Sequence, residues 1–83
     1  MAREEALLIV SKLEECSGPI RFEFELDDLF MFSIQRGCDC IVVYKETRKA
    51  VWENELPDEE VTLIYRRYHK MLSQSHGLNC KEA

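Results

Sequence analysis

The sequence lacks any long apolar run. The longest uninterrupted one, residues 6–10 (ALLIV), is far shorter than the roughly 20 residues that a membrane-spanning helix needs. It also follows Arg3-Glu4-Glu5 rather than the basic segment that begins a secretory signal. We therefore expect no signal peptide, no membrane contact and a cytoplasmic location.

Glycine and proline are scarce, with three and two residues in a chain of 83. With 46% hydrophobic and 33% charged residues, the composition is that of a globular domain, not of a disordered or fibrous chain. A chain of this length has room for one hydrophobic core. We expect a single domain over residues 1–83, in which residues 77–83 form a flexible C-terminal tail.

The chain also has no surplus of positive charge. Its formal net charge is −5, whereas a protein that binds phosphate backbones usually carries a basic surface. The surplus of acidic residues lies in the first 30 residues. General affinity for nucleic acid is therefore not expected.

Apolar residues at helical spacing predict a helix near each end of the chain. The first covers residues 2–16 and ends at Ser17-Gly18-Pro19, which disfavours helical geometry. The second begins at Pro57 with an acidic first turn and ends at about His76, before Gly77. Its buried face would consist of Val61, Ile64, Tyr65, Tyr68 and Leu72.

Alternating apolar and polar residues predict four strands between the helices, at residues 20–26, 29–35, 40–45 and 49–53. Their short connections favour a four-stranded antiparallel meander, with both helices packed on one face. The fold class is therefore α+β, with the order α-β-β-β-β-α.

The strand register follows from keeping one face apolar. A three-residue first loop pairs Phe24 with Phe32, and the next loop pairs Ile34 with Ile41. The last turn would set Glu46 opposite Lys49. The face beneath the helices would then consist of Ile20, Phe22, Phe24, Leu26, Phe30, Phe32, Ile34, Ile41, Val43, Ala50 and Trp52.

Two cysteines stand one residue apart in the segment RGCDC, residues 36–40. Cys38 and Cys40 could form a zinc site with Cys16, Cys80, His69 or His76, but their spacing is shorter than that of structural zinc sites. A disulfide between them would be strained, and Asp39 opposes the positive charge that activates a thiol. We interpret the segment as a loop with Gly37 at its bend, and we expect no metal and no cofactor. The alternative is a thiol or zinc protein centred on Cys38 and Cys40.

No spacing typical of an enzyme occurs in the chain, such as a phosphate loop, a nucleophile elbow or an H-E-x-x-H pair. His69 and His76 have no identifiable nucleophile or proton-transfer partner beside them. We therefore expect a protein without catalytic residues.

The second face of the predicted sheet carries a strip of apolar side chains. If both helices cover the other face, this strip is exposed, and exposed apolar surface on a small protein often marks an interaction site. The sequence thus predicts a protein-interaction module, an adaptor or a small inhibitor of the type that phages and mobile elements encode. It would bind a protein partner through this outer face or associate with itself as a homodimer. The strip consists of Met31, Val42, Tyr44 and Val51, bordered by Glu23 and Glu25.

The solvent side of the second helix presents Leu63 with three bases, Arg66, Arg67 and Lys70. Positive charge in the later part of a helix is favourable whatever the function, and the stripe has no interleaved aromatic residues of the kind on which bases stack. We include these bases among the candidate interaction residues. Contact with nucleic acid through them is the second alternative.

Overall fold

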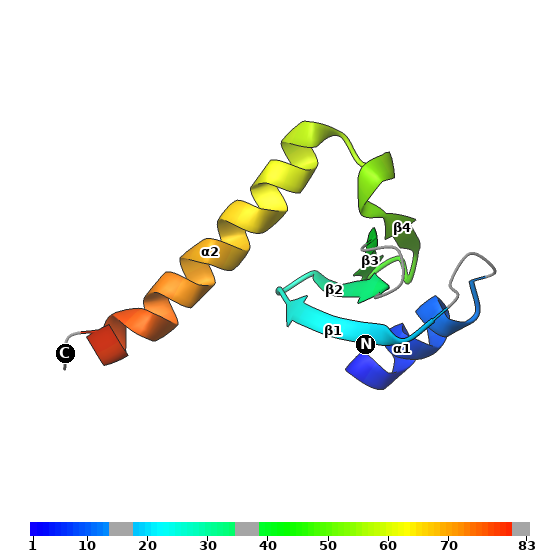
Figure 1. Cartoon of the computed structure of the whole chain (residues 1–83), viewed down its shortest axis with the longest axis horizontal. Helices are drawn as coiled ribbons and strands as arrows, with labels where there is room; N and C mark the ends of the chain where they lie inside the picture. The colour runs from blue at the N-terminus through cyan, green and yellow to red at the C-terminus, as the bar shows by residue number, and fades with distance from the viewer. Residues whose placement is uncertain (14–17, 35–38, 81–83) are drawn as a thin grey trace.

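The computed structural model describes residues 1–13, 18–34 and 39–80, with side chains described as far as residue 74. The elements are α1 (Arg3–Ser11), β1 (Ile20–Glu25), β2 (Leu29–Ile34), β3 (Asp39–Tyr44), β4 (Ala50–Trp52), the short 3-10 helix η1 (Glu53–Glu55) and α2 (Asp58–Cys80). The four strands form one antiparallel sheet in the order β1-β2-β3-β4 (Figure 1). This confirms the predicted α+β class and the order of the elements.

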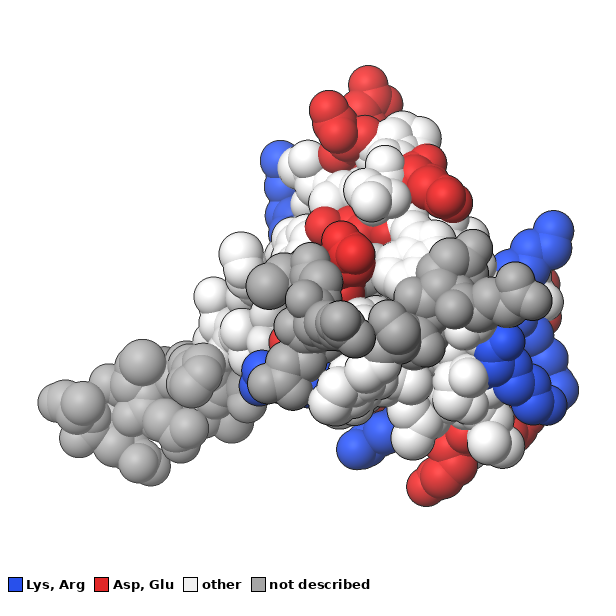
Figure 2. All heavy atoms as spheres, turned by 45° about the vertical axis from the view of Figure 1, so that its right-hand side comes forward, with Lys and Arg blue, Asp and Glu red and all other residues white. Residues whose placement is uncertain are grey.

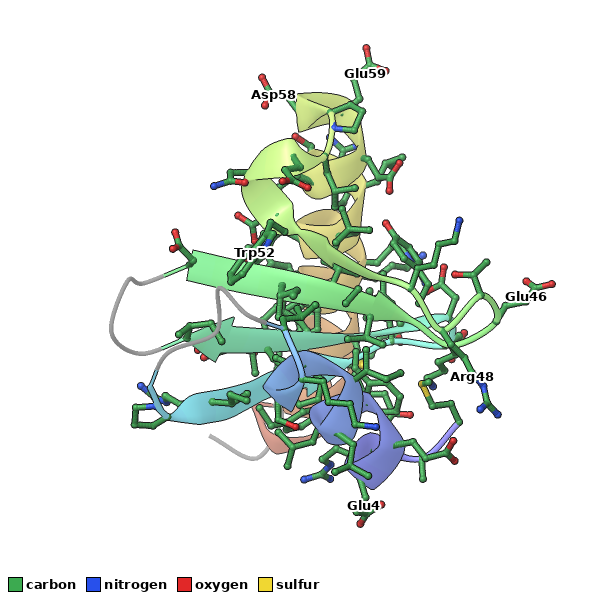
Figure 3. All side chains as sticks on the ribbon, turned by 90° about the vertical axis from the view of Figure 1, so that its right-hand side faces the viewer. Glu4, Glu46, Arg48, Trp52, Asp58 and Glu59 are labelled. Atoms are coloured by element: carbon green, nitrogen blue, oxygen red, sulfur yellow. The ribbon has the colours of Figure 1, made fainter. Side chains whose placement is uncertain are left out.

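The two helices cover opposite faces of the sheet, so the prediction that both pack on one face is wrong. On one face, Ala6 and Val10 of α1 pack against Phe30, Phe32, Ile34, Ile41 and Val43. On the other, Ile64 of α2 packs against Phe24, Leu26, Leu29, Met31 and Val42. Figure 3 shows α1 in front of the sheet and α2 behind it. The physical reason is that β2 and β3 are apolar on both sides, and strands of this kind must be covered on both faces.

A β-bulge moves part of β1 from one face to the other. Phe22 pairs with Phe32, whereas Phe24 pairs with Met31, so the register shifts between the two phenylalanines. The turn between β1 and β2 is short, and within it the Leu26 N–H donates to the Leu29 carbonyl at 2.9 Å. This hydrogen bond fixes how the ends of β1 and β2 nearest the turn pair. The extra residue in the bulge lets the rest of β1 keep its apolar side on the α1 face. The predicted pairing of Phe24 with Phe32 is therefore wrong, and Phe24 and Leu26 belong to the core under α2.

The other two pairs of strands are shifted by two residues from the predicted register. β2 and β3 pair Phe32 with Ile41, and β3 and β4 pair Val42 with Val51. A shift of two residues leaves every side chain on its original face. The face predicted for each residue of β2, β3 and β4 is therefore correct although its partner is not.

The register shift between β3 and β4 is caused by the length of their connection, which has four residues, 45–48, between the paired residues Tyr44 and Lys49. The Tyr44 N–H donates to the Lys49 carbonyl at 2.9 Å, and the Arg48 N–H donates to the Tyr44 carbonyl at 2.8 Å. Arg48 adopts a left-handed backbone, with φ 60°. Glu46 therefore lies within the turn and is not paired with Lys49 across two strands.

Both helices differ in length from the prediction. α1 has 9 residues and ends at Ser11, and Cys16 lies outside the described residues. α2 has 23 residues and continues past Gly77 to Cys80. Figure 1 shows the later part of α2 extending beyond the sheet. The radius of gyration is accordingly 14.0 Å, against about 12 Å for a compact domain of this length.

The described residues contain two α-helices, α1 and α2. Neither is both long enough and apolar enough to cross a bilayer.

Candidate interaction surface

The predicted apolar strip on the second face of the sheet is not exposed. Met31 and Val42 have no solvent-accessible surface, and Val51, which pairs with Val42, is half-buried. Met31 and Val42, with the half-buried Tyr44 beside them, belong to the core under α2, which covers the face that we expected to be open. The prediction of an exposed interaction strip at these residues is therefore wrong.

Two tyrosine hydroxyls hold α2 in place, one by a hydrogen bond between the sheet and α2 and the other by a bond between α2 and η1. The Tyr44 hydroxyl, on β3, donates to the Glu60 carboxylate in the first turn of α2. The Tyr65 hydroxyl, on α2, donates to the Glu53 carboxylate of η1 at 2.5 Å. Burial and the hydrogen bond to Glu60 raise the pKa of Tyr44 to about 12, and burial with the bond to Glu53 also raises the pKa of Tyr65. Both hydroxyls therefore keep their protons and act as donors at neutral pH.

Aromatic rings hold the middle of α2 against β1. The rings of Phe24 and Tyr68 are stacked, with centroids 3.9 Å apart and planes 12° apart. Tyr65 meets the edge of the same phenylalanine, with centroids 6.0 Å apart. The bulge in β1 is what turns Phe24 toward α2, so the bulge and the position of the helix depend on each other.

An ion pair joins α2 to the β1–β2 turn. Arg67 Nη2 lies 2.7 Å from Asp28 Oδ1, and this hydrogen bond lowers the pKa of the Asp28 carboxyl and raises that of Arg67. Both side chains are largely exposed, so the pair contributes little to stability. Arg67, which we predicted to belong to an unpaired basic stripe, is therefore paired with Asp28 within the fold.

The two acids predicted to border the strip are also paired within the sheet. Glu23 accepts a hydrogen bond from the Ser33 hydroxyl at 2.6 Å. Glu25 lies 2.7 Å from Lys45 Nζ. Glu23 therefore joins β1 to β2, and Glu25 joins β1 to the residue that follows β3, so the two acids do not form an unpaired acidic border.

The outer face of α2, opposite the side that packs on the sheet, is open. It consists of Glu59, Leu63, Arg66 and Lys70, all exposed. Their spacing of four, three and four residues places them along one stripe of the helix. Within the described part of the chain, neither Arg66 nor Lys70 has an ion-pair partner.

Charge on this outer face changes sign along the helix. Acidic residues precede and occupy the first turn of α2, and Asp58 and Glu59 project from that end of the molecule (Figure 3). Figure 2 shows acidic side chains gathered at the same end. Arg66 and Lys70 follow two to three turns later. An acid at the start of a helix is stabilised by the helix dipole, so these acidic residues also favour the folding of α2.

Leu63 lies between the acidic and basic parts of the outer face. Its side chain is 53% exposed, and it borders a shallow hollow of about 180 Å³. The other residues that line the hollow are Asp28, Leu29, Tyr44, Glu60, Ile64 and Arg67. Leu63 therefore lies at the edge of the contact between α2 and the sheet and leaves about half of its apolar side chain in solvent.

Cys40 and His69, the cysteine and histidine whose side chains are described, have no surroundings that would make them reactive. Cys40 is half-buried, and burial together with the nearby Glu53 carboxylate raises the pKa of its thiol. His69 is exposed beside Tyr68, with ring centroids 5.8 Å apart. Among the described residues, no three His, Cys, Asp or Glu side chains are placed to hold a metal ion. Cys38 and the predicted loop at Gly37 lie outside the described residues, as do the side chains of His76 and Cys80.

Comparison with protein-family models, curated proteins and solved structures found no match to this chain. Any function of the chain has to be inferred from its own residues. Sequence reasoning included Arg66 and Lys70 among the interaction residues but left out Glu59 and Leu63. The available signal was that Leu63 is out of phase with the apolar stripe that packs on the sheet.

Proposed function

We propose that this chain is a non-enzymatic protein-interaction module and that the outer face of α2 is its recognition surface. The observation that carries this proposal is that α2 closes the sheet with one side and leaves a stripe with an exposed leucine among charges on the other. Apolar contact at the centre with charges around it is the usual composition of a protein interface.

The attachment of α2 supports this function. Hydrogen bonds from Tyr44 and Tyr65, the stack of Phe24 on Tyr68 and the ion pair of Arg67 fix the helix from several sides. A surface that is already ordered loses less conformational entropy when a partner binds. The outer face is therefore presented in one orientation.

The chemistry of the described polar groups supports a role without catalysis. A nucleophilic cysteine needs a lowered thiol pKa, whereas the pKa of Cys40 is raised. The Tyr44 and Tyr65 hydroxyls are bound to carboxylates that hold α2 in place. The free thiol of Cys40 also suits a reducing compartment, so we place the module in the cytoplasm.

A protein partner is favoured over nucleic acid by the charges on the same helix. Arg66 and Lys70 are the two bases of the outer face, and Glu59 on that face would repel phosphate. Affinity for nucleic acid depends on neutralising several phosphates at once. A surface with both signs of charge fits a protein of matching charges better.

Site-specific photo-crosslinking tests this proposal. A photoreactive phenylalanine replaces Leu63, and the matched control carries it at Glu46, an exposed residue of the β3–β4 turn (Figure 3). In the cells that produce the protein, we expect a discrete protein adduct from position 63 and none from position 46. No adduct from position 63, or equal yields from both positions, would contradict the proposal.

A further inference from the structure

The outer face of α2 is complementary to itself when two copies lie antiparallel. Its acid, Glu59, is near the start of the helix, and its bases, Arg66 and Lys70, are further along. In an antiparallel pair, the acidic end of each helix faces the basic part of the other. A parallel pair would place like charges side by side, which disfavours association.

The spacing of the outer face selects one register. When Glu59 lies opposite Lys70 of the second copy, Leu63 lies opposite Arg66, and both contacts occur twice because of the two-fold symmetry. The two Leu63 side chains are then offset by about 4.5 Å along the helix direction. At the usual spacing of packed helices, about 8–10 Å, they can touch each other and the aliphatic part of Arg66.

Access to this face is open. Glu59, Arg66 and Lys70 point away from Ile64, which packs on the sheet, whereas Leu63 lies about 100° from Ile64 around the helix and borders the hollow beside Leu29. All four side chains are exposed. Arg67 is held by Asp28, so its charge does not stand unpaired beside the same residue of the second copy.

We propose that the chain forms a symmetric homodimer through antiparallel α2 helices, with Glu59 paired to Lys70 of the second copy and Leu63 close to the two-fold axis, opposite Arg66 of the second copy. This inference rests on the proposed function and names a second copy of the chain as the partner. Exposed ion pairs are weakened by salt. The dimer is therefore salt-sensitive.

Charge exchange tests the pairing in the purified full-length protein. In Glu59→Lys or Lys70→Glu, both symmetric pairs become repulsive, and we expect the dimer dissociation constant to rise by about tenfold or more. The double variant, Glu59→Lys with Lys70→Glu, restores opposite charges in both pairs, so it should dimerise like the wild type. Sedimentation velocity at low salt measures the dimer, and helical circular dichroism confirms that each variant is folded.

Three results would overturn the inference. They are a wild-type protein that stays monomeric at low salt, single variants that dimerise like the wild type, and a double variant that remains as weak as the single ones. The proposed function is tested separately by the mass of the photo-crosslinked adduct from position 63. An adduct with a different protein would leave the proposed function standing and remove the homodimer, whereas the absence of any adduct would remove both.

Discussion

Phe24 and Tyr68 are stacked across the junction between the sheet and α2, with ring centroids 3.9 Å apart. They are far apart in the sequence, and their contact exists because the bulge in β1 turns Phe24 away from the α1 face. Phe22, two residues earlier, remains on the α1 face and meets Phe32 edge-on at 5.8 Å. Two neighbouring phenylalanines of one strand thus serve two different cores.

This arrangement predicts unequal effects for the two phenylalanines. Phe24 is 6% exposed and Phe22 is 38% exposed. Replacing a buried phenylalanine with alanine typically lowers the free energy of unfolding by about 3 to 5 kcal/mol. We expect Phe24→Ala to fall near the lower end of that range and Phe22→Ala to have a clearly smaller effect in urea denaturation. Equal losses would show that β1 does not change face at the bulge.

Covering of the second face predicts that a charge at Met31 unfolds the protein. Met31 is fully buried under α2, and an unpaired buried charge is strongly unfavourable. Met31→Lys should therefore lower the free energy of unfolding by about 3 kcal/mol or more. Leu63→Lys, on the exposed side of α2, is the control and should change it by less than about 0.5 kcal/mol. A folded and stable Met31→Lys variant would mean that α2 does not cover this face.

The Tyr44–Glu60 hydrogen bond predicts a loss of stability at alkaline pH. The pKa of Tyr44 is about 12 in the folded protein, above its ordinary value of 10.0. The contribution is fully present below pH 10 and is lost as the pH rises through about 12, because the unfolded chain loses the proton first. Tyr44→Phe should have a flatter stability curve between these values than the wild type. Parallel curves would show that the hydroxyl is not bound to Glu60.

The Asp28–Arg67 ion pair predicts a specific change in a carboxyl titration. The hydrogen bond from Arg67 holds the pKa of Asp28 below its ordinary value of 3.8. Its contribution to stability is therefore present above pH 3.8 and is lost as the pH falls through the lower folded value. In an NMR titration, Arg67→Gln should return the Asp28 pKa toward the ordinary value, and Arg66→Gln should leave it unchanged. The same shift in both variants would argue against this pair.

The environment of Cys40 predicts slow alkylation. Burial and the Glu53 carboxylate raise the pKa of its thiol, and the thiolate is the reactive form. In a chain whose other three cysteines are replaced by serine, Cys40 should react with iodoacetamide more slowly at pH 8 than in the unfolded chain. Glu53→Gln should speed the reaction of the folded protein. Faster alkylation in the folded state than in the unfolded state would instead support the thiol alternative.

Much of the sheet could be predicted from the sequence because alternation fixes which face each side chain occupies. Phe30, Phe32, Ile41 and Val43 lie together on the α1 face as expected. The register could not be fixed in the same way, since a shift of two residues preserves every face and only the loop length distinguishes the alternatives. The four-residue loop after Tyr44 is such a case.

The position of α2 could not be obtained from local pattern. An amphipathic helix has an apolar side whether it packs on one face of a sheet or the other. The deciding feature was that β2 is buried at five of its six positions, which requires cover on both sides. The apolar residues Met31 and Val42 were correctly grouped on one face, but they are the core under α2 and not an exposed surface.

A crosslinking scan along α2 tests most directly whether its outer face is the recognition surface. Photoreactive phenylalanine is placed in turn at the outer-face positions Glu59, Leu63, Arg66 and Lys70, and at Thr62 and His69, which are exposed on the flank of the helix. The account predicts adducts from the four outer-face positions and much lower yields from the two flanking ones. Equal yields from all six positions, or higher yields from the flank, would contradict it.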